Sequence, residues 1–129
     1  MDTRYEQGRD LLKTIAGAHG DRLIEGLDSV APGYSESLIA FAFGEICRRP
    51  GLELTTRELI TIAALASLGS ANHQLKLHVG GALRVGCTPA EIVEVLVQIG
   101  LYAGIPATLN GLAAAGEVFD EHDRGQIRR

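Results

Sequence analysis

Aromatic residues are scarce in this chain: they make up 5% of its 129 residues, and tryptophan is absent. The interior must therefore be built from Leu, Ile, Val and Ala, whose small side chains let helices approach closely. The length is typical of one domain, and a hydrophobic content of 46% argues against disorder. We expect a single domain over residues 1–129 with a modest core, and surplus apolar surface that favours self-association.

Basic clusters and paired cysteines are also missing. The net charge is −4, and Lys and Arg gather only in the terminal RGQIRR, so no nucleic-acid partner is expected. Cys47 and Cys87 form no C-x-x-C, which argues against a disulfide framework and against a zinc site. No run approaches the roughly 20 apolar residues that cross a bilayer, and MDTRYEQGRDLLK lacks the apolar stretch of a signal peptide. The sequence predicts a cytoplasmic protein with no membrane partner.

Apolar residues instead recur at helical spacing, without the alternation of strands. Capping boxes at Thr55 with Glu58 and at Thr88 with Glu91 mark two helix starts. The run 59–68 is apolar almost all round, which predicts a helix buried on most sides. We expect an all-α bundle of five or six helices, over about residues 3–18, 35–49, 55–68, 70–85, 88–101 and 106–122.

Two histidines stand in one of these helices. His73 and His78 are five residues apart and so point about 140° away from each other, which prevents both from binding one metal ion. No metal site is expected. His73 is predicted to be exposed, whereas His78 lies on or beside the apolar face. Gly80 and Gly81 follow it at a cost of about 1 kcal/mol each relative to Ala, which indicates close approach of a helix or a ligand. His78 is therefore either a core histidine with one hydrogen bond or a functional group.

Four further polar side chains interrupt apolar segments. Each has a structural explanation: the cap for Glu58, solvation for Arg57, a surface turn for Glu45 and simple packing for Tyr102. Spacing leaves both the structural and the functional interpretation open for all four.

Four motifs taken together carry more information. They are R-E-L at 57–59, H-x-x-x-A-L at 78–83, T-x-x-E-I-x-E-V-L at 88–96 and Y-x-G-x-P-A at 102–107. Over about residues 41–115 the chain resembles the carboxymuconolactone decarboxylase family. The resemblance implies an all-α, alkyl hydroperoxidase D-like fold and a homo-oligomer, a ring-like hexamer built as a trimer of dimers.

The family has a redox branch and a decarboxylase branch. In the redox branch a C-x-x-C precedes the histidine, and its cysteines would fall at positions 71 and 74, where this chain has Ala71 and Gln74. Thiol peroxidase activity is therefore disfavoured. The decarboxylase branch keeps the histidine and an acidic residue upstream, here His78 and Glu58, and Glu45 also matches its pattern.

The resemblance implies a carboxy-lyase of the 4-carboxymuconolactone decarboxylase type, without a cofactor, that acts on a small-molecule substrate in aromatic-compound catabolism. Arg57 and Tyr102 are the expected substrate-binding residues, and Arg57 suits a dianion. The expected catalytic residues are His78, which would stabilise a dienolate oxygen or reprotonate carbon, and Glu45 and Glu58, one of which would orient it. The alternatives are a family enzyme for a different small acid or lactone, and a non-catalytic oligomeric protein that binds small molecules.

Overall fold

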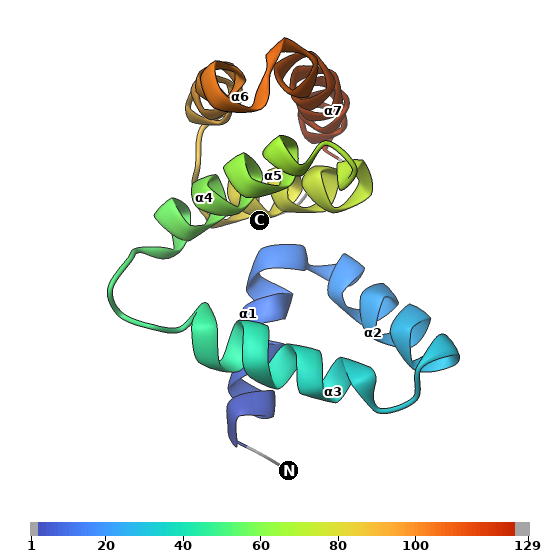
Figure 1. The fold of residues 1–129 in the computed structure, drawn as a ribbon. Coiled ribbons are helices and arrows are strands. Elements are labelled where there is room, and N and C mark those ends of the chain that lie inside the picture. The colour runs from blue at the N-terminus through green and yellow to red at the C-terminus, as the bar shows by residue number, and fades with distance from the viewer. Residues whose placement is uncertain (1–2, 126–129) are drawn as a thin grey trace. The chain divides into compact units, whose positions relative to one another are not determined.

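The structure, a computed structural model, describes residues 3–125 (Figure 1), and all its regular elements within that range are helical. The all-α prediction is confirmed. The helix count differs from the predicted five or six, because seven α-helices and one π-helix are present in the described range. They are α1 (Thr3–Ala16), α2 (Ala18–Val30), α3 (Tyr34–Leu38), η1 (Ile39–Ile46), α4 (Leu54–Leu68), α5 (Asn72–Val85), α6 (Pro89–Ala103) and α7 (Ile105–Asp123). None of these helices combines the length and apolar character needed to cross a membrane.

Two compact units divide the chain after Glu53. The N-terminal unit holds α1, α2, α3 and η1, and the C-terminal unit holds α4 to α7. Each unit has its own packing and is described separately.

The N-terminal unit is built around the contact of α1 with the π-helix η1. The backbones meet at two glycines: a Cβ on Gly8 would overlap the carbonyl oxygen of Ile39, and one on Gly44 would overlap that of Arg4. In η1 the hydrogen bonds skip one residue more than in an α-helix, as in the bond from Cys47 N to Ala42 O (2.9 Å) that closes it. Only glycine at both positions permits this approach.

The C-terminal unit has an aliphatic core. Its buried members include one aliphatic face from each of α4, α5, α6 and α7, and none of them is aromatic: Ile62, Ala66, Leu75, Val79, Ala82, Leu83, Cys87, Ile92, Leu96, Ala114, Ala115 and Val118. Gly111 on α7 faces the Leu96 side chain so closely that a Cβ there would displace it. The core predicted from the scarcity of aromatics is thus found in this unit.

Two local predictions about α4 are wrong. The helix is not buried on most sides in the single chain, because Ile60 is 52% exposed and Leu68 is 68% exposed. It also begins at Leu54, so Thr55 lies inside the helix instead of capping it. The second capping box is confirmed: Glu91 N donates to Thr88 Oγ1 (3.1 Å), and Thr88 N donates to Glu91 Oε1 (2.8 Å).

Candidate functional site

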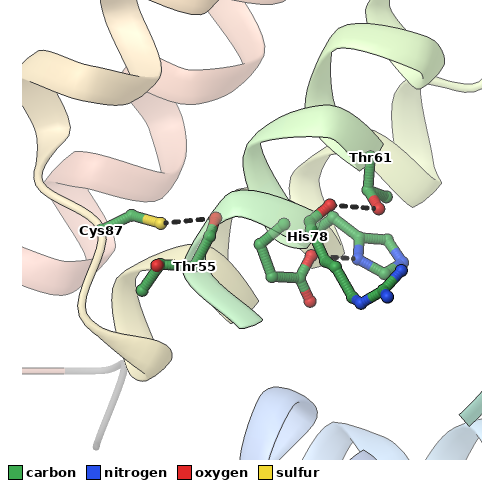
Figure 2. A network of polar contacts seen from close by, with 6 residues as sticks. Thr55, Thr61, His78 and Cys87 are labelled. Atoms are coloured by element: carbon green, nitrogen blue, oxygen red, sulfur yellow. Dashed lines mark hydrogen bonds and ion pairs between the residues drawn. The ribbon is translucent and has the colours of Figure 1, made fainter. Parts of the chain in front are cut away.

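A buried carboxylate and a half-buried imidazole meet between α4 and α5. His78 Nδ1 lies 2.9 Å from Glu58 Oε2. The Glu58 side chain is 4% exposed and that of His78 is 26% exposed, so the carboxylate is enclosed and the imidazole is accessible from outside. Figure 2 shows the His78 ring beside α4, with Thr61 on the same side of that helix. The structure therefore joins two residues that stand twenty positions apart in the sequence.

The pairing assigns roles to the two ring nitrogens. An ionised carboxylate can only accept hydrogen bonds, so Nδ1 carries a hydrogen and donates it to Glu58. Nε2 is left for another partner, as an acceptor when the ring is neutral and as a donor when it is protonated. This is the arrangement in which a carboxylate holds a histidine in one tautomer and stabilises its imidazolium form.

Glu58 owes this position to its place on α4. It shares a helix face with Ile62, one turn further on, which is fully buried in the core. A carboxylate held among core residues requires a hydrogen-bonded partner, since an unpaired buried charge is strongly destabilising. His78 supplies that partner, so the capping explanation of Glu58 is replaced by a tertiary one.

His78 lies beside the buried face of α5, as its spacing predicted. Leu75, Val79 and Ala82 are buried in the core, and Gly80 and Gly81 are buried as well. The two glycines thus lie in the buried part of α5. His73 is exposed, as predicted.

Cys87 is hydrogen-bonded to α4, the helix that carries Glu58, and no second cysteine lies near it in the sequence. Its Sγ donates to Thr55 O at 3.4 Å, in the first turn of α4 (Figure 2). Burial raises the pKa of the Cys87 thiol, and the negative charges of Glu91 and Glu58 raise it further. Neither Cys87 nor Cys47 takes part in a disulfide bond among the residues that the structure describes. The protonated, buried Cys87 is a packing residue and a weak donor, because the reactive form of cysteine is the thiolate.

The remaining predicted residues lie on α4, on α6 and in the N-terminal unit. Arg57 precedes Glu58 on α4 and is half-buried, and its carbonyl oxygen accepts a hydrogen bond from Thr61 Oγ1 (2.9 Å). Glu45 belongs to the N-terminal unit, where its Oε1 lies 2.7 Å from Arg4 Nη1. Tyr102 lies in the last turn of α6, with 91% of its surface exposed. Of the five residues, Glu58 and His78 are joined directly by a side-chain hydrogen bond.

Sequence reasoning missed Thr61 and the bond from Cys87 to Thr55. Thr61 stands three residues after Glu58, a spacing that places two side chains on one helix face. The helical spacing in the sequence could therefore have indicated this neighbour. The Cys87 bond joins positions 32 residues apart, and no local signal predicts it. Among residues 3–125 no group of three or more His, Cys, Asp or Glu side chains is arranged to hold a metal ion.

Comparison with known proteins adds a family relationship. The model of a family described as the carboxymuconolactone decarboxylase family matches residues 32–117. A 4-carboxymuconolactone decarboxylase of Acinetobacter baylyi is 35% identical over 121 residues, which cover 93% of this chain and 90% of that protein. A nitrosuccinic acid decarboxylase of Metarhizium robertsii is 26% identical over 128 residues, covering 97% of this chain and 88% of that protein. An uncharacterized 15.0 kDa protein of Paracoccus denitrificans is 29% identical over 119 residues, covering 92% and 89%.

Proposed function

The chain belongs to the carboxymuconolactone decarboxylase family, and from this premise we propose that it is a cofactor-free decarboxylase of a carboxylated unsaturated lactone of the 4-carboxymuconolactone type. The observation that carries the proposal is the pair of His78 and Glu58, which leaves one accessible imidazole nitrogen backed by a buried carboxylate. The relatives named as decarboxylases support the reaction class.

The substrate itself supplies the electron sink. When the carboxylate leaves as CO2, the electron pair of the broken carbon–carbon bond moves through the adjacent double bond onto the lactone carbonyl oxygen, which forms a dienolate. A proton then adds to a carbon of the dienolate, which restores the charge balance. The protein needs only to bind the anion, stabilise the dienolate oxygen and deliver the proton, so no cofactor is required.

His78 suits the last two tasks. A protonated Nε2 donates a hydrogen bond to the dienolate oxygen and then delivers its proton to carbon, and the neutral ring regains a proton from water. Glu58 holds Nδ1–H throughout and stabilises the imidazolium state. Because the Glu58 carboxylate is 4% exposed, water does not compete for it, and its interaction with the ring is stronger than at the surface.

Arg57 is proposed to bind the carboxylates of the substrate. A guanidinium presents paired N–H donors to a carboxylate, and Arg57 precedes Glu58 on the same helix. Glu45 and Tyr102 enter the proposal through the family pattern, Glu45 as a second acidic group and Tyr102 as a substrate contact. The same pattern leads us to propose a cytoplasmic hexamer, arranged as a trimer of dimers.

A second candidate substrate class is a small acyclic acid. The relative named for nitrosuccinic acid favours it, because a carboxylate next to a nitro group also loses CO2 with the electrons moving onto oxygen. The same site would then donate to a nitronate in place of a dienolate.

Release of CO2 tests the proposal. The purified protein is incubated separately with 4-carboxymuconolactone and with nitrosuccinic acid, and CO2 is measured against a His78→Asn control. Enzyme-dependent release from the lactone that the control lacks supports the first substrate class, and release from nitrosuccinic acid alone supports the second. Folded protein that releases CO2 from neither compound, nor from a panel of other carboxylated lactones, would favour the non-catalytic binding protein.

A further inference from the structure

The carboxylate behind His78 suits a step that decarboxylation does not include. When CO2 leaves, the electron pair comes from the broken carbon–carbon bond, so no base is needed, and an acid acts only afterwards. Glu58 Oε2 lies 2.9 Å from Nδ1 of His78, and the Glu58 side chain is 4% exposed. A buried carboxylate in this position favours the imidazolium form, which helps an imidazole to accept a proton. The pair is therefore suited to removing a proton from a ligand as well as to delivering one.

Nε2 of His78 is the nitrogen that this network presents to a ligand. Because Nδ1–H is donated to Glu58, Nε2 of the neutral ring keeps an available lone pair, and 26% of the His78 side chain is exposed. Thr61, on the same side of α4 in Figure 2, donates its hydroxyl hydrogen to Arg57 O over 2.9 Å. That hydrogen is committed to the backbone, and the Glu58 carboxylate is enclosed. We therefore expect one imidazole nitrogen to serve every carbon at which a ligand exchanges a proton.

An unsaturated lactone without the leaving carboxylate reaches the same dienolate by losing a proton. In a β,γ-unsaturated butenolide, the proton passes from the α-carbon to Nε2, and the C–H electron pair moves onto the carbonyl oxygen. The imidazolium then returns a proton to the γ-carbon, the electrons move back from oxygen, and the α,β-unsaturated isomer forms. One C–H bond breaks and another forms, so the lactone is neither oxidised nor reduced and no co-reactant is required.

We propose that the chain is also an isomerase of unsaturated lactones, which uses His78 to move the double bond of a butenolide between the α,β and β,γ positions. The α- and γ-carbons flank a single carbon of a flat five-membered ring, so one nitrogen above a face of that ring can serve both. A carboxylate on the γ-substituent gives Arg57 the group for which a guanidinium is suited. This activity rests on the lactone class proposed above, because both reactions pass through the same dienolate.

The exposure of His78 indicates the source of the returned proton. Its side chain is 26% exposed, so a proton on Nε2 can exchange with water before it is delivered. In heavy water, the isomer formed from the β,γ-unsaturated lactone should therefore carry deuterium at the γ-carbon. The remaining β,γ-unsaturated lactone should gain deuterium at the α-carbon, because the first step is reversible.

Proton nuclear magnetic resonance in heavy water tests the isomerase. The protein is incubated with γ-carboxymethyl butenolide, starting separately from each isomer, and the rates are compared with those in buffer alone. We expect both reactions to reach the same mixture of isomers. His78→Asn should slow them by about 10²–10⁴-fold, whereas His73→Gln, at an exposed position of the same helix, should match the wild type. The saturated γ-carboxymethyl lactone is the matched ligand control: its enolate is not conjugated with a second double bond, so it should gain no deuterium above the buffer rate.

Release of CO2 from 4-carboxymuconolactone is measured in parallel, so that the two activities can fail separately. Isomerisation without CO2 release would support the isomerase and contradict the decarboxylase. Absence of isomerisation would overturn the isomerase, whether or not CO2 is released. Deuterium at the α-carbon with no second isomer would also overturn it, because the imidazole would then serve one carbon only. Isomerisation at the wild-type rate in a folded His78→Asn variant, checked by circular dichroism, would exclude His78 as the base.

Discussion

Replacing His78 by asparagine or by glutamine separates the two roles of its ring. The amide nitrogen of Asn lies near the position of Nδ1 and can keep the hydrogen bond to Glu58, whereas that of Gln lies near Nε2 and leaves Glu58 without this donor. Neither amide titrates, so neither can transfer a proton. Both variants should lose turnover by about 10²–10⁴-fold, the usual contribution of a general acid or base.

Their stabilities should differ, and the structure sets the scale. The Glu58 carboxylate is 4% exposed, so a hydrogen bond to it is a charge-assisted one that contributes about 1.5–3 kcal/mol. His78→Gln should lower the free energy of unfolding by about that amount, which for a chain of this size lowers Tm by roughly 5–15 °C. His78→Asn should stay within a few degrees of the wild type, because it retains the donor.

Thermal unfolding followed by circular dichroism, combined with CO2 release from the active substrate, measures both quantities. His73→Gln is the matched control on the same helix: its side chain is exposed, and both turnover and Tm should remain near the wild type. Normal turnover in the Asn variant would refute the catalytic role of His78. Equal destabilisation of the Asn and Gln variants would refute the role of Nδ1 in holding Glu58.

Three further predictions address the two units and the cysteines. Gly44→Ala should lower the stability of the N-terminal unit by about 1–3 kcal/mol, since its Cβ would meet the Arg4 carbonyl oxygen, whereas Gly26→Ala, which faces open space, should stabilise by about 0.4–1 kcal/mol in denaturant unfolding. Because the pKa of Cys87 is raised in the folded state, the unfolded chain releases this proton first, so stability should fall as pH rises through about 8.5 and beyond. Cys87→Ala should reduce that fall between pH 7 and 9.5, and an unchanged or steeper fall would contradict the assignment. A peroxidase assay with an organic hydroperoxide and a dithiol should show no turnover, and turnover lost on Cys47→Ser would reveal a thiol centre.

Local sequence patterns were sufficient to predict where most of the helices begin and end. The predicted ranges for α4 to α7 agree with the structure to within about two residues, because apolar spacing, the box at Thr88 and the turn glycines act over a few neighbouring positions. The range 35–49 is found as α3 followed by η1. The π-register of η1 has no counterpart in the apolar spacing and was not predicted.

Helix α2 was missed for a physical reason. Over Ala18–Val30 only Gly20 is buried, so the segment carries little of the apolar periodicity that burial imposes. Its separation from α1 occurs at Gly17, where φ is 55°, a conformation that the sequence permits without requiring.

The sequence identified both His78 and Glu58 as candidates, because each is a polar residue in an apolar helix and each matches a family motif. Ala71 and Gln74 also showed that the C-x-x-C is absent. The sequence did not predict that His78 and Glu58 are in contact. Whether Glu58 closes a cap or pairs with an imidazole depends on where α4 begins, and on how α5 packs against it twenty residues later. The same four-residue pattern at Thr88 does form a cap, so the pattern cannot distinguish the two outcomes. Only the packing of the helices decides between a cap and a pair with an imidazole. Burial of the carboxylate makes a hydrogen bond to another helix more stabilising than one within its own first turn.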